Sequence, residues 1–133
     1  MQSADARGSR PLSPHLSIYR WRITMTMSIF HRVTGAGLYF AVAILVWWLA
    51  AAATGPGAFA FANAVVTSWF GLLVLFAASW GLIHHGLGGL RHFVWDFGVA
   101  MEPGTRDQMA WATLIGSLVL TVGVWAVVFL VWR

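Results

Sequence analysis

The chain has 133 residues, of which 59% are hydrophobic and 9% are charged, and this composition excludes an ordinary soluble domain and indicates an integral membrane protein. Cysteine is absent, which excludes disulfides, thiolate metal sites and cysteine-held iron–sulfur clusters, so any iron in this chain would be held by histidine. The net charge of +4 comes from arginines beside the expected membrane spans rather than along one polar face, which argues against nucleic acid as a partner.

Residues 1–26 are expected to form a cytoplasmic arm. The first 22 residues are polar and basic, contain Pro11 and Pro14, and lack the apolar core of a signal peptide, so we expect the arm to be retained. His15 is expected to be a loop residue. The first span follows at about 27–53, and Thr54-Gly55-Pro56-Gly57 then breaks the helix.

No Asp, Glu, Lys or Arg occurs between Val33 and Leu90. One crossing needs about 20 mostly apolar residues, so this stretch is long enough for two. A short apolar link and a second span at about 63–93 would return the chain to the surface from which it started. The hairpin would bring His31-Arg32 and Arg91-His92 to the same surface, with His84-His85 just inside.

A surface loop is expected at 96–108, which carries four charges together with Pro103 and Gly104, and a third span at about 109–132. The predicted fold is therefore an all-α membrane domain (27–133) with three helices running up, down and up, as part of a hetero-oligomeric helix bundle. The N-terminal side of the membrane carries seven of the eight arginines: Arg7, Arg10, Arg20, Arg22, Arg32, Arg91 and Arg106. The positive-inside tendency makes that side cytoplasmic, or the matrix side in a mitochondrion. We expect a bacterial inner membrane, because lysine is missing and no transit peptide precedes the arm.

The second span carries a candidate haem site. Helical spacing places Gly81, His85, Gly89 and His92 on one stripe, although helix packing alone could explain the glycines. Neutral imidazole is the usual haem ligand, and we expect His85 to be an axial ligand, with a hydrogen-bonded structural histidine as the alternative. His84 points about 100° away and is expected to serve packing or a partner.

Two haem propionates would need cations where water is scarce. Arg32, Arg91, His31 and His92 fit that need, although His31 and His92 could instead be interfacial residues that reach toward the headgroups. Asp96 either orients His92 or is a solvated acid beside the membrane.

The first span carries a candidate quinone site. Ser28 and Arg32 are four residues apart, with Gly35 following on the same side. A hydroxyl and a guanidinium at the mouth of an apolar pocket could hold the carbonyl oxygens of a quinone and stabilise negative charge on its reduction. The alternative is that Ser28 merely caps the first span.

Two motifs resemble a known family. They are Arg10-Pro11-Leu12-Ser13-Pro14-His15-Leu16 with Ile18-Tyr19 and Ser28-Ile29-Phe30-His31-Arg32-Val33-Thr34-Gly35, and His85-Gly86-Leu87-Gly88-Gly89-Leu90-Arg91-His92 followed by Asp96-Phe97-Gly98. Their order and the three-span layout resemble the cytochrome b membrane-anchor subunit of succinate dehydrogenase, respiratory complex II. The resemblance covers nearly the whole chain.

The resemblance implies a role for each matched residue. His85 aligns with the axial ligand of haem b, Ser28 and Arg32 with ubiquinone-site residues, and His31 with a position near a haem propionate. A slip of one residue would move the ligand to His84, although the spacing to Gly89 and His92 favours His85. The other axial histidine would come from a second small anchor subunit.

The family's reaction is succinate oxidation at a flavin in a separate subunit, with electrons passing through iron–sulfur clusters to quinone. This chain has no Gly-rich dinucleotide fingerprint and no cysteine, so the resemblance assigns flavin and clusters to a flavoprotein and an iron–sulfur partner. This chain alone would not oxidise succinate. Two alternatives remain at this stage: a haem b anchor of a fumarate reductase or another quinone-linked dehydrogenase, and a haem-free structural anchor.

Overall fold

The computed structural model describes residues 19–131, and all regular structure in that range is helical. The elements are α1 (Ile23–Thr54), α2 (Pro56–Val66), α3 (Trp69–Asp96) and α4 (Pro103–Val131). α1, α3 and α4 are long and apolar enough to cross a membrane. The predicted all-α membrane fold with three spans is therefore confirmed. Most of the expected N-terminal arm, with His15, lies outside the described residues.

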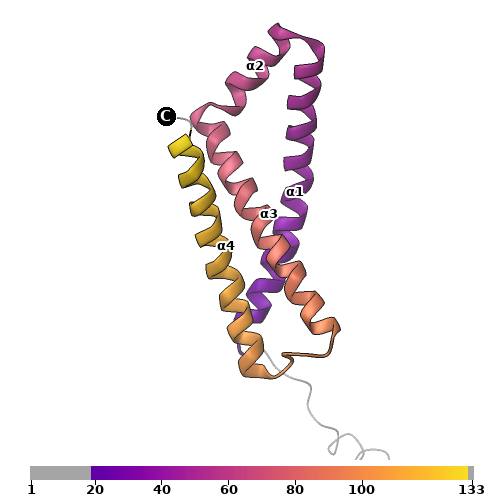
Figure 1. Cartoon of the computed structure of the whole chain (residues 1–133). Coiled ribbons are helices and arrows are strands. Elements are labelled where there is room, and N and C mark those ends of the chain that lie inside the picture. Colours follow the sequence, from indigo (N-terminus) through magenta and orange to yellow (C-terminus); the bar gives the residue numbers. More distant parts are fainter. Residues whose placement is uncertain (1–18, 132–133) are drawn as a thin grey trace, which may run out of the picture.

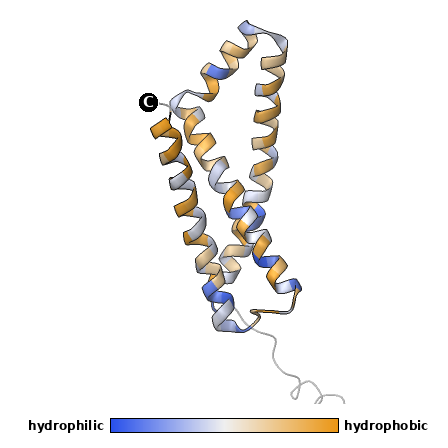
Figure 2. Ribbon diagram, viewed as in Figure 1, coloured by the Kyte–Doolittle hydropathy of each residue, from blue (hydrophilic) through white to orange (hydrophobic). Residues whose placement is uncertain are grey.

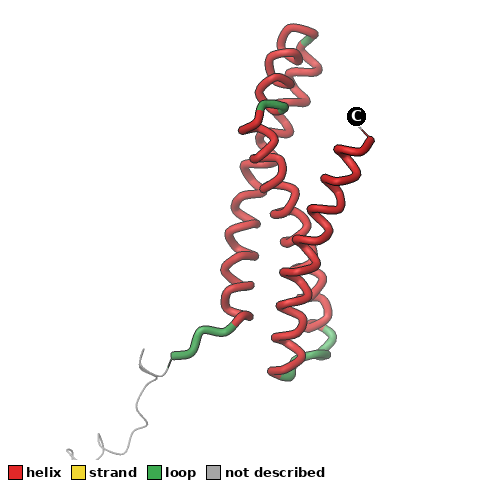
Figure 3. Tube along the Cα trace, turned by 90° about the vertical axis from the view of Figure 1, so that its left-hand side faces the viewer, coloured by secondary structure: helices red, strands yellow, loops and turns green. Residues whose placement is uncertain are grey.

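The three long helices run up, down and up (Figure 1). α1 and α3 cross in the lower half of the molecule and diverge above it, where α2 bridges them, and α4 packs along α3. A view turned by 90° shows that all connections between the helices are short loops (Figure 3). α1 begins, α3 ends and α4 begins at the lower end, which we call the site end.

The expected apolar link between the first two spans is a helix, α2. Gly55, at the end of α1, has a φ of 139°, which favours glycine, and Pro56 suits the first position of the next helix because its missing N–H would have no helical partner. The second long helix consequently begins at Trp69 rather than near 63. Ser68 caps it by accepting a hydrogen bond from the Gly71 N–H (3.1 Å).

The expected loop at 96–108 is shorter in the structure. α3 continues to Asp96 and α4 begins at Pro103, so the connection spans only 97–102. Gly98 and Ala100 turn the chain there with φ values of 72° and 59°. Pro103 is accommodated because the first helical turn needs no N–H donor at that position. The charged residues Arg106 and Asp107 therefore lie on α4 rather than in a loop.

Small residues form the contact between α3 and α4. The buried residues of α4 recur at helical spacing, and they are Ala110, Thr113, Ser117 and Thr121. On α3 the buried residues are Gly81, His84, Gly88 and Arg91. His84 contacts Ser117 of α4, whereas Gly81 and Gly88 face Thr34 and His31 of α1. Small side chains let membrane helices approach closely. This contact fixes which face of α3 points inward.

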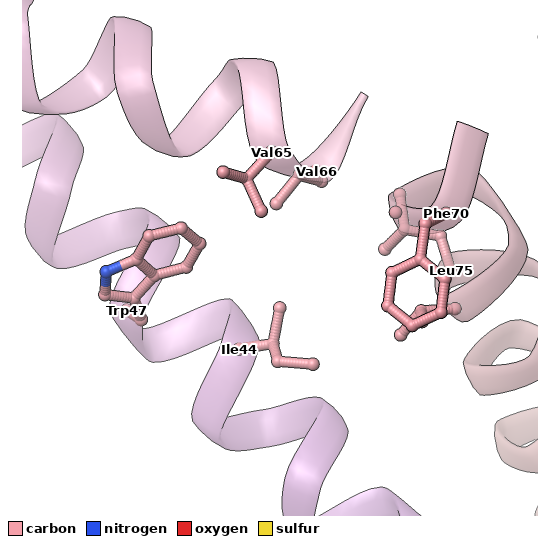
Figure 4. A pocket seen from close by; sticks show the side chains of 8 residues that line it. Ile44, Trp47, Val65, Val66, Phe70 and Leu75 are labelled. Carbon is pink, nitrogen blue, oxygen red and sulfur yellow. The ribbon is translucent and has the colours of Figure 1, made fainter. Parts of the chain in front are cut away.

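The outward surface of the helices is apolar. Tyr39 and Phe40 are 84% and 74% exposed, as expected for side chains that face lipid or a partner helix. An apolar cavity of about 130 Å³ lies where α1 and α3 diverge, lined by Ile44 and Trp47 of α1, by Val65 and Val66 of α2, and by residues of α3 including Phe70 and Leu75 (Figure 4). Hydrophilic ribbon is concentrated instead in the lower part of the molecule (Figure 2).

Candidate functional site

Three histidines from α1 and α3 meet near the site end. The rings of His31 and His85 are stacked, with centroids 3.9 Å apart and planes at 18°. His92 approaches His31 edge-on, with ring centroids 5.4 Å apart. The structure thus brings the two motifs together across the α1–α3 contact.

The hydrogen bonding of His85 defines its tautomer. Its Nδ1 lies 3.0 Å from the carbonyl oxygen of His31, and 3.5 Å from the hydroxyl of Thr34. A carbonyl oxygen only accepts hydrogen bonds, so Nδ1 carries the proton in this contact. In a neutral imidazole, Nε2 then keeps the lone pair that a metal ion would require.

Two glycines make room for the stacked rings. A Cβ on Gly35 would lie 2.9 Å from His85 Cε1, and a Cβ on Gly88 would lie 2.5 Å from His31 Cδ2. A Cβ on Gly89 would meet nothing within 4 Å. Gly89 therefore takes no part in helix packing within this chain. Gly88 and the buried face of α3 provide the contact instead.

His84 is the buried histidine of the α3–α4 contact, with 1% of its surface exposed. Its Nδ1 lies 3.1 Å from the Ser117 hydroxyl, which also accepts from Trp80 Nε1 (3.2 Å) and donates to the Leu114 carbonyl (2.8 Å). The hydroxyl has one proton, so His84 Nδ1 must be the donor. This hydrogen bonding accounts for His84 as a structural residue, and sequence reasoning missed Ser117 and Trp80.

Ser28 and Arg32 are hydrogen-bonded to each other on the exposed side of α1. Arg32 Nη2 donates to Ser28 Oγ at 3.2 Å. Both residues line a hollow of about 330 Å³ whose other walls include Tyr19, Trp21 and Ile29. α1 begins at Ile23 with Arg22 as its N-cap, so the alternative that Ser28 caps the first span is wrong.

Arg91 lies on a different face of α3 from His85. It is 5% exposed, its guanidinium carbon lies 5.1 Å from the centroid of the Trp95 ring, and it shares a cavity with Trp95 and with Arg106 of α4. Sequence reasoning did not select Trp95 or Arg106 as site residues. The position of Arg106 beside the membrane could have indicated a site residue. It was not selected because the expected loop at 96–108 included it. Asp96 is exposed at the end of α3.

Within residues 19–131 no group of three or more His, Cys, Asp or Glu side chains is arranged to hold a metal ion. A haem iron needs only axial ligands from the protein. The lone pair on His85 Nε2 could provide one of the two. The buried Nε2 of His31 also lacks a hydrogen-bond partner among the described residues. The donor set of this chain therefore fits one axial position of a haem.

Comparison with known proteins identifies the family. The sequence profile described as "Succinate dehydrogenase/Fumarate reductase transmembrane subunit" matches residues 6–124. The chain belongs to this family. It is 45% identical over 116 residues to the succinate dehydrogenase cytochrome b556 subunit of Paracoccus denitrificans, which covers 87% of this chain and 89% of that protein.

Other relatives carry similar names. The cytochrome b556 subunit of Rickettsia felis is 38% identical over 87% of this chain and 90% of its own length. The mitochondrial cytochrome b560 subunit of Sus scrofa is 34% identical over 86% of this chain and 69% of its own length. Membership in this family makes the chain a membrane-anchor subunit of the enzyme complex and not its catalytic flavoprotein.

Proposed function

We propose that this chain anchors succinate dehydrogenase in the membrane, binds one side of a haem b and forms part of the site where ubiquinone is reduced. The observation that carries the proposal is the hydrogen bond between His85 Nδ1 and the His31 carbonyl (3.0 Å), which leaves Nε2 free for iron. The names of the relatives, which are cytochromes b, support a haem of this type.

His85 is proposed as the axial ligand from this chain, and a histidine of a second small anchor subunit as the other. Iron with two histidine ligands has no open position and transfers electrons rather than binding oxygen. The residues of this chain orient the ligand, because Gly35 allows the ring to lie against α1 and the His31 carbonyl fixes its tautomer. The buried hydrogen bond from His84 to Ser117 supports assigning the ligand to His85 rather than His84.

The propionates are proposed to contact His31, Arg32, Arg91 and His92. The His31 ring stacks on the His85 ring, and the His92 ring contacts the His31 ring. The buried Nε2 of His31 needs a polar partner. Arg32 lies one residue after His31 on an exposed part of α1. Arg91 belongs to this set through its charge, since its guanidinium lines the cavity that it shares with His92. A guanidinium binds a carboxylate through two parallel hydrogen bonds.

The quinone is proposed to bind at Ser28 and Arg32. The two side chains are 3.2 Å apart and open into the same hollow, so a hydroxyl donor and a positive charge are presented together. Preorganised donors of this kind stabilise negative charge as it develops on a carbonyl oxygen. The aromatic rings of Tyr19 and Trp21 provide walls for a flat ring.

The remaining partners follow from the reaction. Succinate would be oxidised by a flavoprotein, and an iron–sulfur protein would carry the electrons to the site end, since this chain has no cysteine. The distribution of arginines supports a cytoplasmic site end in a bacterial inner membrane. The direction of electron flow that we propose is from succinate to quinone, in the respiratory chain and the citric acid cycle.

The test is purification of the tagged chain from its native membrane in a mild detergent. We expect a flavoprotein, an iron–sulfur protein and a second small membrane protein to accompany it, and we expect b-type bands in the reduced-minus-oxidised spectrum. An assembled complex without these bands would contradict haem binding and support the alternative of a haem-free structural anchor. A complex that oxidises quinol with fumarate but does not reduce quinone with succinate would favour the fumarate reductase alternative.

A further inference from the structure

A second polar cavity lies at the site end, between α1, α3 and α4, and is open on one side. It measures about 420 Å³. Its lining residues are Thr24 and Ser28 of α1, Arg91, His92 and Trp95 of α3, Met101 of the connecting loop and Arg106 of α4. Among these described residues there are two guanidiniums and no carboxylate.

Several donors around this cavity are buried without a partner. Among the described residues, Arg91 Nε and Nη1, Trp95 Nε1 and Arg106 Nε have no hydrogen-bond acceptor. Arg91 is 5% exposed, so its guanidinium is largely removed from bulk solvent. Buried donors, and buried charges above all, are normally paired.

The nearest acid in the sequence does not satisfy these donors. Asp107 follows Arg106, but its own Oδ1 is buried without a partner in the described part of the chain. Among the residues that line the cavity, the buried atoms without a partner are all donors, and they come from Arg91 and Trp95 of α3 and Arg106 of α4, which is the arrangement expected around an anion.

We propose that this cavity binds an oxyanion, and that Arg106 and Trp95 bind it together with Arg91. Guanidinium groups match carboxylates and phosphates in geometry and charge, and an indole N–H adds a further donor. Two sources of such a group are present at a membrane surface next to a haem site: the phosphate of a phospholipid and a haem propionate.

The phosphate is the source that goes beyond the propionate contacts already proposed for Arg91 and His92. Arg91 follows His85 by six residues, which places it about 120° around the helix from the face that carries the stacked histidines. Trp95 and Met101 add apolar walls beside the polar groups, as suits a lipid headgroup at the interface. Binding of a propionate in this cavity depends on the proposed haem site, whereas binding of a lipid phosphate does not.

The experiment uses the purified complex, stripped of lipid in detergent, with dioleoylphosphatidylglycerol as the probe. Bound lipid is counted by native mass spectrometry for wild type, Arg106→Gln and Trp95→Phe. Arg22→Gln is the matched control, because Arg22 is an exposed arginine at the same end that does not line the cavity. The reduction potential of the haem is measured on the same samples.

We expect one tightly bound lipid, with about tenfold weaker binding in Arg106→Gln, which corresponds to the loss of one charge-assisted hydrogen bond. Trp95→Phe keeps an aromatic ring without changing any charge and removes the N–H together with the rest of the pyrrole ring, so it decides the question if Arg106→Gln does not assemble. A lower haem potential in these variants with unchanged lipid binding would identify the occupant as a propionate. If both quantities match those of Arg22→Gln, no oxyanion binds in the cavity and the proposal is refuted.

Discussion

Replacing Gly88 with alanine tests the contact between the histidines of α1 and α3. A Cβ at this position would lie 2.5 Å from His31 Cδ2, whereas carbon atoms in contact are normally about 3.5–4.0 Å apart. The His31 ring would have to recede by about 1 Å or more to reach such a distance. Its stack on His85, with centroids 3.9 Å apart, opposes that movement.

The expected cost follows from these distances. Overfilling a packed contact costs about 1–3 kcal/mol, and loss of an aromatic pair costs about 0.5–1.5 kcal/mol. We therefore expect Gly88→Ala to destabilise the complex by about 1–3 kcal/mol, after the small gain in helix propensity from alanine. The assay is thermal denaturation of the purified complex, followed by haem absorbance, together with the haem content per complex.

Two comparisons make this result specific. Gly123→Ala, near the other end of α4, places its methyl group in a position with nothing within 4 Å in this chain and away from the histidines, so we expect it to match or exceed wild type. His31→Ala should abolish most of the cost of Gly88→Ala, because the ring that clashes is then gone. Equal costs of Gly88→Ala with and without the His31 ring would refute the proposed contact.

Further predictions concern the buried hydrogen bond of His84 and the proposed quinone site. Ser117→Ala removes the acceptor of the buried His84 N–H and should cost about 1–3 kcal/mol, seen as a lower melting temperature with haem retained, whereas Ser79→Ala, whose hydroxyl bonds only within α3, should change little. Retention of full stability in Ser117→Ala would argue against that hydrogen bond. Arg32→Leu should slow quinone reduction by about 10- to 150-fold, and Ser28→Ala by less, while reduction of a soluble dye by succinate persists. Normal quinone reduction in both variants would remove them from the quinone site.

The three spans were predictable from the sequence, because runs of about 20 apolar residues without charge are the length that a bilayer crossing requires and are rare in soluble domains. The sequence was less informative about where helices end. Pro103 and the charges near it indicated a loop, yet proline fits the first turn of α4 and charged side chains are tolerated at the membrane surface. This error also hid Arg106, which was assigned to a loop and not to a cavity wall.

Helix rotation was the second limit. His84 and His85, like Gly88 and Gly89, are adjacent, and a spacing of three, four and seven residues fits either member of each pair. Which member faces inward depends on where α1 and α4 lie around α3, and that is set by long-range packing such as the small residues of α4. The meeting of His31 with the end of α3 was predictable from the hairpin alone.

The reduced-minus-oxidised spectrum of the complex carrying His85→Ala, compared with His84→Ala, tests the central claim most directly. We predict that His85→Ala loses the b-type bands. In the wild-type chain the hydrogen bond from His85 Nδ1 to the His31 carbonyl leaves a lone pair on Nε2 for iron, and the variant lacks this ligand. His84→Ala should keep the bands with reduced stability. Retained bands in His85→Ala, or their loss only in His84→Ala, would contradict the assignment of the haem ligand.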